Sequence, residues 1–153
     1  MKKAFLVLAL AGCMQREARD ETNTTAAKSE TFTEQAQAGA ALYGQHCAKC
    51  HGDSGEGTDK APRVVGLDQG ALPLDPPAER KKRTMQFKTV ADVAKFAVQN
   101  MPPKTPGVLP EADYWRILAF DLKANGIDLG DKHLDMPLAE TLEIPRATKT
   151  SQR

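Results

Sequence analysis

Aromatic side chains are scarce in this sequence. They make up 5% of its 153 residues, with a single Trp among them. Aromatic residues supply much of the buried surface in protein cores, so this shortage leaves little with which protein alone can fill an interior. A buried group that is not protein would make up the deficit. The length suits one domain and leaves no room for two.

Charge of one sign is also lacking, because 21 Lys and Arg residues are balanced by 20 Asp and Glu residues. Proteins that bind nucleic acid present a basic surface to the phosphates, so a nucleic-acid partner is not expected. Cysteine is also rare, with three residues in the whole sequence: Cys13, Cys47 and Cys50. Three cysteines cannot all pair with one another, so a disulfide framework does not explain them.

The apolar run at residues 4–11 is too short for a membrane-spanning helix, which needs roughly 20 residues. It follows a Met-Lys-Lys start and ends at Gly12, which is the pattern of an export signal. We therefore interpret residues 1–12 as a signal peptide that is removed after export.

The boundary at residues 10–13, Leu-Ala-Gly-Cys, resembles the lipobox of bacterial lipoproteins. In that family the Cys becomes the first mature residue and its sulfur carries a diacylglyceryl group. The resemblance predicts lipid attachment at Cys13, and acyl chains contribute about 0.8 kcal/mol of membrane binding for each buried methylene. The alternative is an ordinary signal peptide that happens to contain a cysteine.

The composition changes twice along the mature chain. Residues 13–32 are polar and charged without a periodic apolar face, which predicts a flexible tether. Residues 33–126 carry the periodic segments and are expected to form the folded domain. Residues 127–153 end in a nearly wholly polar stretch, so we expect a C-terminal tail that is partly disordered.

Three segments have the apolar spacing of helices, at about residues 33–48, 90–100 and 110–124, and no strand pattern is persuasive. Thr33 and Thr89 are suitable caps for the first two helices. These features predict an all-α fold of about three main helices.

Gly39 lies inside the first of these helices. A Gly in a helix costs roughly 1 kcal/mol relative to Ala, so it usually indicates that another backbone approaches closely. We expect a helix crossing at this position.

Cys47-Ala48-Lys49-Cys50-His51 has the C-x-x-C-H spacing of covalent c-type haem attachment. Two thiols three positions apart can each bond to one vinyl group of the porphyrin, and the adjacent imidazole can then bind the iron. A structural zinc site would need about four ligands, and no second cysteine pair exists. A thioredoxin-like redox pair would need a neighbouring strand pattern, which is missing. We therefore expect one covalent haem c, with His51 as an axial ligand.

The second axial ligand has several candidates. Met101 is favoured because it follows an amphipathic helix and precedes Pro102-Pro103, which forces the chain into an extended loop. Filling a gap in the core is the other interpretation of this side chain. Besides Met101, the side chains of the right type are Met85, Met136, His133 and His46, the last of which lies too close to the cysteine pair to reach the opposite face of a haem.

Residues 33–126 resemble the class I cytochrome c family. The resemblance rests on C-x-x-C-H, a preceding Gly and aromatic residue (Gly39 and Tyr43), a following Ala61-Pro62, a Met-Pro at Met101, and an aromatic final helix. It implies a compact cytochrome c fold around one haem, in which the Pro62 carbonyl accepts a hydrogen bond from His51 and Met101 is the distal ligand.

The same resemblance implies that Gly39 and Tyr43 pack against Ile117 and Phe120. The segment from Leu67 to Lys88 is longer than the one that the smallest family members carry.

An iron with both axial positions taken transfers electrons and leaves no site for a substrate. We therefore expect a single-haem electron carrier rather than an enzyme, tethered by Cys13 in a bacterial cell envelope and facing the periplasm, with the choice of membrane left open. Its partners would be redox proteins or a respiratory complex, without a small-molecule substrate. The basic run Arg80–Arg83 is a candidate docking patch, and a solvated loop is the alternative.

A haem enzyme or a sensor of gas or peroxide is the alternative function. It would need an open or labile sixth position on the iron, and a peroxidase would also need a distal acid-base group. His133 is the one plausible distal histidine in the sequence.

Overall fold

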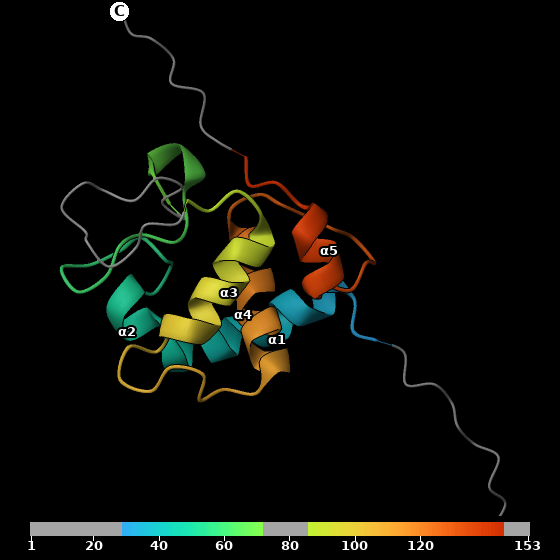
Figure 1. Cartoon of the computed structure of the whole chain (residues 1–153). Helices are drawn as coiled ribbons and strands as arrows, with labels where there is room; N and C mark the ends of the chain where they lie inside the picture. Colours follow the sequence, from blue (N-terminus) through green and yellow to red (C-terminus); the bar gives the residue numbers. More distant parts are fainter. Residues whose placement is uncertain (1–28, 72–85, 146–153) are drawn as a thin grey trace, which may run out of the picture.

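The computed structural model describes residues 29–71 and 86–145 (Figure 1). In these ranges the chain is helical and contains no strand, apart from an isolated bridge between Thr89 and Glu143, which confirms the all-α fold. The helices are α1 (Phe32–His46), α2 (Ala48–His51), the 3-10 helix η1 (Leu67–Gln69), α3 (Val90–Asn100), α4 (Glu111–Ala124) and α5 (Met136–Thr141). Within these two ranges, no helix has both the length and the apolar character of a membrane span.

Helix α1 begins one residue earlier than its predicted start, and its cap is Thr31 rather than Thr33. The Thr31 hydroxyl accepts a hydrogen bond from the backbone N–H of Glu34 at 3.2 Å, and the Glu34 carboxylate accepts one from the backbone N–H of Thr31 at 2.7 Å. This reciprocal capping box satisfies two of the amide groups that a helix start leaves unpaired. Thr33 therefore lies inside the first turn.

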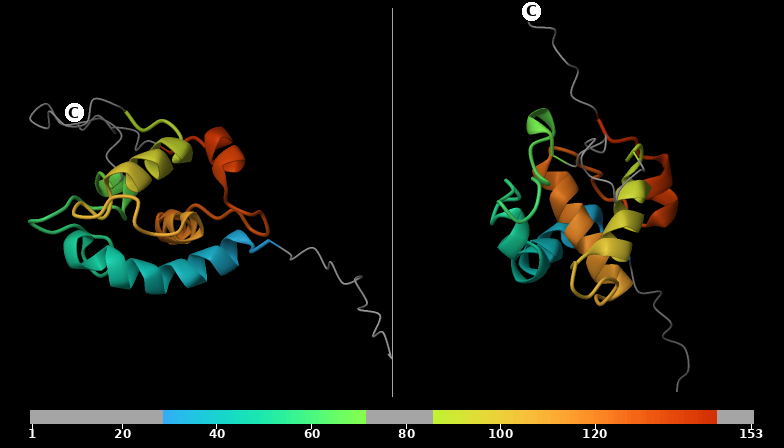
Figure 2. Two further views of the ribbon diagram at one scale, coloured as in Figure 1. Left: turned by 60° about the horizontal axis from the view of Figure 1, so that its bottom comes forward. Right: turned by 60° about the vertical axis from the view of Figure 1, so that its left-hand side comes forward.

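Helices α1 and α4 form the central crossing of the fold, and the left view of Figure 2 shows α4 nearly end-on above α1. The contact is so close that a Cβ atom on Gly39 would overlap the backbone carbonyl of Arg116. Next to it, the rings of Tyr43 and Phe120 lie 5.0 Å apart. The helix crossing predicted from Gly39 is confirmed, and so is the packing of Tyr43 against Phe120.

The hydrophobic core lies between α1, α3, α4 and the C-terminal segment. Its members come from every one of these elements and include Phe32, Val90, Leu118, Ala119, Leu122, Leu134 and Ala139, none of which is more than 5% exposed. Burying an aliphatic side chain of this size contributes about 1.5–3 kcal/mol, so these contacts supply the main stabilisation of the domain.

The segment after α4 is packed on this core as far as Ile144, and it includes α5, which the sequence pattern did not predict. Gln35 of α1 holds this segment. Its side-chain amide donates to the carbonyl of Leu134 at 3.0 Å and accepts from the N–H of the same residue at 2.7 Å. Gln35 is 1% exposed, so both hydrogen bonds are protected from water.

Replacing Gln35 with Leu is expected to lower the free energy of unfolding by about 2 kcal/mol, because the N–H and carbonyl of Leu134 would remain buried without partners. Urea denaturation measures this change. Gln37→Leu is the matched control, since Gln37 lies exposed on the same helix and its replacement should change stability by less than about 0.5 kcal/mol. Equal stability of the two variants would contradict the assigned role of Gln35.

Candidate haem site

The C-x-x-C-H residues occupy the turn between α1 and α2 and all of α2. The N–H of Cys47 donates to the carbonyl of Tyr43 at 2.8 Å and closes α1, and Cys47 then serves as the first cap of α2. The N–H groups of Cys50 and His51 both donate to the carbonyl of Cys47 at 3.0 Å. One short turn therefore carries both thiols and the imidazole. Cys47 and Cys50 are free thiols and are half-buried.

The imidazole of His51 is held by the loop that follows α2. Its Nδ1 lies 2.7 Å from the carbonyl oxygen of Pro62, which is the contact implied by the cytochrome c resemblance. A carbonyl oxygen only accepts hydrogen bonds, so Nδ1 carries the hydrogen and donates it. The lone pair of the neutral ring is then on Nε2, the arrangement that a metal ligand requires.

The carbonyl groups of α2 are also fixed by hydrogen bonds. The Tyr43 hydroxyl donates to the carbonyl of Gly52 at 2.9 Å, and the N–H of Gly57 donates to the carbonyl of His51 at 2.6 Å. The Thr58 hydroxyl donates to the carbonyl of Cys50. These bonds connect α2 to α1 on one side and to the following loop on the other, so the His51 side chain sits on a supported element.

That loop is in turn fastened to the end of α4 by Asn125. The Asn125 side chain accepts from the N–H of Gly66 and donates to the carbonyl of Val64, each at 2.8 Å. No expectation from the sequence assigns Asn125 this role. The signal could not be read from the sequence, because the partners are about 60 positions away along the chain.

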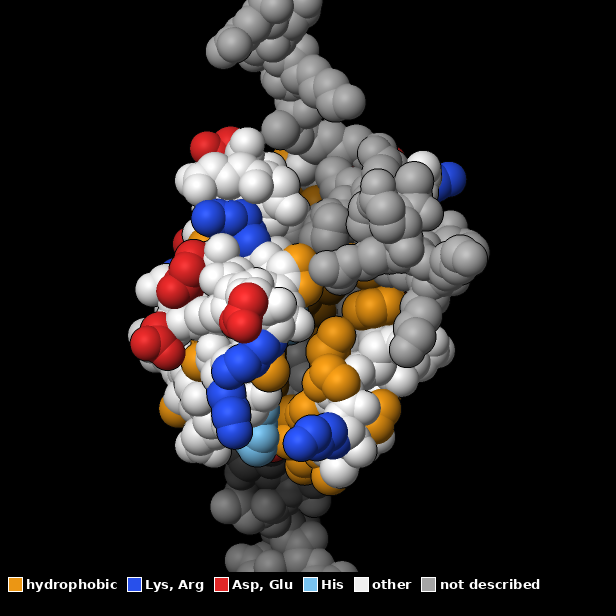
Figure 3. Space-filling view, turned by 90° about the vertical axis from the view of Figure 1, so that its left-hand side faces the viewer, with side chains coloured by type: hydrophobic (Ala, Val, Ile, Leu, Met, Phe, Trp, Pro, Cys, Tyr) orange, Lys and Arg blue, Asp and Glu red, His pale blue; other side chains and the backbone are white. Residues whose placement is uncertain are grey.

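Met101 is the C-cap of α3 and is half-buried. The hydroxyl of Tyr114 in α4 donates to the Met101 carbonyl at 2.6 Å, which connects the end of α3 to α4 at this point. Figure 3 shows hydrophobic side chains gathered around a hollow on the face of the molecule that carries α2 and the loop after it.

The other candidate axial ligands lie elsewhere or outside the described ranges. Met136 begins α5, on the side of the molecule opposite α2 in Figures 1 and 2, and it packs against the core. The Nδ1 atom of His133 lies 2.7 Å from the carbonyl of Glu30, just before α1, and His46 is exposed at the end of that helix. Met85 and the run Arg80–Arg83 belong to the part of the chain that is not described.

These residues fit a c-type haem. Two free thiols, an imidazole with its metal-binding nitrogen available and a hollow with hydrophobic walls provide the bonds and the apolar surroundings that the cofactor needs. Among residues 29–71 and 86–145, no group of three or more His, Cys, Asp and Glu side chains is arranged to hold a metal ion directly.

Burial dominates the electrostatics around the Cys47 thiol. It raises the pKa of Cys47 to about 12, with a further contribution from the carboxyl group of Asp121. It also raises the pKa of Tyr43, again assisted by Asp121. Asp121 itself was missed by the sequence analysis, although its spacing from Ile117 places it on the buried face of the helix.

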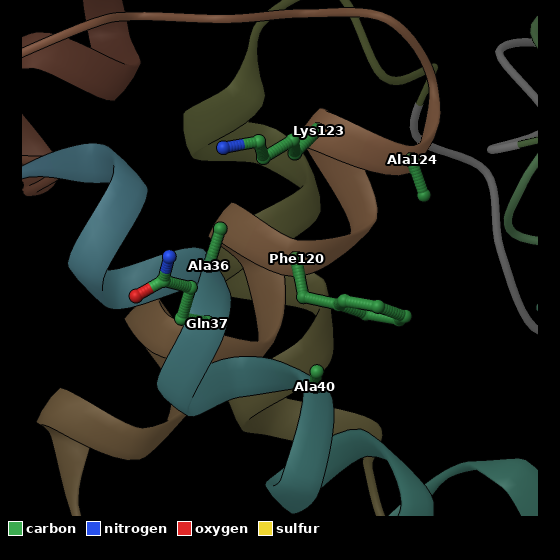
Figure 4. A pocket seen from close by; sticks show the side chains of 6 residues that line it. All are labelled: Ala36, Gln37, Ala40, Phe120, Lys123 and Ala124. Atoms are coloured by element: carbon green, nitrogen blue, oxygen red, sulfur yellow. The ribbon is translucent and has the colours of Figure 1, made fainter.

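A second hollow lies between side chains of α1 and α4, with a volume of about 320 Å³ (Figure 4). It is lined mostly by small apolar groups and by the Phe120 ring: Ala36, Gln37, Ala40, Phe120, Lys123 and Ala124. None of the C-x-x-C-H residues borders it. Its lining carries no thiol, imidazole or carboxylate, so it lacks the groups with which to bind a haem iron.

Comparison with known proteins shows similarity to a protein family and to a solved structure. Residues 34–120, more than half of the chain, match the family model described as cytochrome c oxidase, cbb3-type, subunit III. A chain in the crystal structure of the sulfane dehydrogenase SoxCD from Paracoccus pantotrophus is similar, with a TM-score of 0.54 and 30% sequence identity over 72% of this chain and 53% of that chain. This protein therefore spans about half of the length of that chain.

No curated protein matches the sequence significantly. The family match coincides with the α1 to α4 region that holds the thiols, the imidazole and the helix crossing. The chain thus belongs to the cytochrome c family represented by subunit III of cbb3-type oxidases, and its folded part is a c-type cytochrome domain that carries electrons with one covalent haem c.

Proposed function

We propose that this protein is a tethered periplasmic electron carrier whose haem is bonded to Cys47 and Cys50, with His51 and Met101 as axial ligands. The observation that carries this assignment is the 2.7 Å contact between His51 Nδ1 and the Pro62 carbonyl, directly beside two half-buried thiols. A histidine with this second hydrogen bond is oriented for iron and cannot rotate freely.

The haem supplies reversible one-electron chemistry, and the protein residues determine how it is held. Cys47 and Cys50 provide covalent attachment, which prevents loss of the cofactor. Pro62 orients His51 and increases the basicity of its Nε2 through the Nδ1 hydrogen bond. The Tyr114 hydroxyl donates a hydrogen bond to the Met101 carbonyl, which fixes the backbone from which the Met101 side chain extends. Apolar walls and a thioether ligand both favour the reduced state.

Two axial protein ligands support electron transfer over catalysis, because no position on the iron is left for a substrate. The location of His133 also argues against a peroxidase. It is bonded to Glu30 before the start of α1, whereas His51 follows the end of that helix. At 1.5 Å per residue the fifteen residues of α1 extend for about 22 Å, too far for His133 to act on a ligand bound at the haem.

Met101→Ala is expected to abolish the near-infrared sulfur-to-iron absorption band of the oxidised protein and to lower its reduction potential, because the thioether would be replaced by water or a stronger donor. Absorbance spectra of protein made in a haem-attaching host measure the first effect. Met136→Ala is the matched control and should keep the band, since Met136 packs at α5. A band that persists in Met101→Ala and disappears in Met85→Ala would assign the ligand to Met85 instead.

The lipid anchor belongs to the same proposal, with residues 1–12 as the signal peptide and Cys13 as the start of a tether. The folded part extends beyond the expected domain bounds of 33–126, because Phe32 and Ile144 both belong to the buried core. Cys13 and the tether up to residue 28 lie outside the described ranges. Cys13→Ser is expected to move the haem protein from the membrane fraction to the soluble periplasmic fraction, because a peptide without acyl chains has no stable hold on the bilayer. Cell fractionation with haem staining detects the change, and retention in the membrane would refute the anchor.

Redox proteins of the cell envelope are the proposed partners. The family is named for an oxidase subunit, and the similar solved chain belongs to a sulfane dehydrogenase, so an oxidase or a dehydrogenase complex is the class of partner favoured. Co-purification from solubilised membranes distinguishes a permanent subunit from a carrier that diffuses. A stable complex that survives high salt would identify a subunit.

A further inference from the structure

Asp121 is a buried acidic residue that no role described above uses. It lies on the inner face of α4, and it is 9% exposed. Its Oδ1 atom is buried and has no hydrogen-bond partner among the residues that the structure describes. A buried polar atom left unpaired costs about 1–3 kcal/mol, so such atoms are rare in native proteins and usually have a function or a missing partner.

The carboxyl group lies within electrostatic range of Cys47, which is proposed to bind the haem. It acts electrostatically on both Tyr43 and Cys47, and Phe120, its neighbour in α4, packs on the Tyr43 ring. Tyr43 is the titratable group that α1 places near it in the haem protein, because the Cys47 sulfur is then bonded to the haem and cannot ionise. The loop after α2 adds only acidic groups to this region, Asp53 and Glu56, which also act on Tyr43.

Burial raises the pKa of Asp121 to about 8, and no other cause contributes. No cation from the described part of the chain offsets the penalty of ionising this carboxyl group. Both its neutral and its ionised form are therefore accessible near physiological pH, which is unusual for Asp because its ordinary value is about 4.

We propose that Asp121 takes up a proton when the haem is reduced and releases it when the haem is oxidised, so that electron transfer by this domain is coupled to proton transfer. The proposal rests on the haem attachment at Cys47 given above. One electron comes from a redox partner and one proton comes from water, and the carboxylate becomes a carboxylic acid. On oxidation the electron passes to the next partner, and the O–H bond breaks to return the proton to solvent.

The sign of the coupling follows from charge. Reduction makes the haem more negative by one unit, and a nearby carboxylate is then less favourable, so Asp121 binds its proton more tightly in the reduced protein. Linkage is reciprocal, which means that bound proton and added electron favour each other by the same free energy. The reduction potential must therefore fall as pH rises through the interval between the pKa values of the oxidised and reduced states.

Spectroelectrochemical titration of the full-length haem protein from about pH 6 to 10 tests the coupling. The potential is expected to fall with pH, by at most 59 mV for each tenfold decrease in proton activity. Asp121→Asn keeps the shape of the side chain but cannot ionise, and it should remove this slope. Asp131→Asn is the control because Asp131 is exposed, and it should leave the slope unchanged. A flat profile in the unmodified protein, or the same slope in Asp121→Asn, would overturn the proposal.

Infrared difference spectroscopy of the unmodified protein provides a second readout that needs no variant to fold. Reduction near pH 8 should produce the C=O band of a protonated carboxylic acid, and its absence would also overturn the proposal. The visible absorbance spectrum of the same sample tests the site assignment separately, because it shows whether a c-type haem is attached. A normal c-type spectrum with a pH-independent potential would refute the proton coupling and leave the proposed electron carrier intact.

Discussion

Replacing Gly39 with Ala is expected to lower the free energy of unfolding by about 3 kcal/mol, in spite of the higher helix propensity of Ala. The added methyl group would overlap the carbonyl of Arg116, which is backbone and cannot move aside without separating α1 from α4. The haem motif directly follows α1, so the shift would also disturb the site. Urea denaturation of the haem protein measures the loss, and the bulkier Gly39→Val should fail to accumulate as folded protein.

Gly44 provides the matched control on the same helix. Apart from its chain neighbours and the nearby backbone of its own helix, no atom of the described residues lies within 4 Å of a Cβ built on Gly44, so Gly44→Ala meets no obstacle there. It should raise stability by about 0.5–1 kcal/mol, because Ala loses less conformational freedom than Gly in a helix. Opposite signs for two identical substitutions would show that the effect comes from the crossing. A stable Gly39→Ala variant would mean that α1 and α4 are farther apart than the structure shows.

Substituting Ser for both Cys47 and Cys50 is expected to abolish covalent haem completely. A hydroxyl group does not add to the vinyl groups under the conditions in which thiols do, so any haem that enters the site would be held by axial ligands and apolar contacts alone. Acid acetone should extract all of the pigment from this variant and none from the unmodified protein. Mass spectrometry of the polypeptide gives the same information, through the presence or absence of the porphyrin mass.

The third cysteine serves as the control for this experiment. Cys13→Ser should retain its pigment through acid acetone, because Cys13 is assigned to lipid and not to haem. Single replacements of Cys47 or Cys50 should keep one thioether bond and a red protein in reduced yield. Pigment that resists extraction from the double variant would refute the assignment of both cysteines.

The local parts of the fold were readable from the sequence. Helix α3 begins and ends where the pattern predicted, since Thr89 starts it and the proline pair after Met101 prevents its continuation. Helix α4 likewise fills the predicted range, because Asn125-Gly126 stops it and Gly126 has a positive φ of 79°. Each of these limits is set by residues next to the helix end, so neighbouring sequence was sufficient.

The features that the sequence did not reveal depend on contacts between distant residues. Gln35 holds Leu134 from 99 positions away, and α5 is ordered because its apolar residues join a core built elsewhere in the chain. Six residues show too little periodicity to be recognised as a helix by themselves. The environment of Asp121 was equally hidden. A single acidic residue among the apolar positions of a helix does not reveal that its carboxyl group is buried with an unpaired oxygen.

Helix α1 separates the point where the tether joins the domain from the haem motif. Arg116 forms a bidentate pair with Glu30 at 2.8 and 3.0 Å, which fixes the chain at the start of α1, while Cys47 and the haem motif follow the other end. If Cys13 is lipidated, the tether from Cys13 to Glu30 can extend no farther than about 60 Å. The membrane would then be attached at the end of the domain where α1 begins. The opposite end, which carries the haem motif, would face away from the bilayer and be accessible to redox proteins.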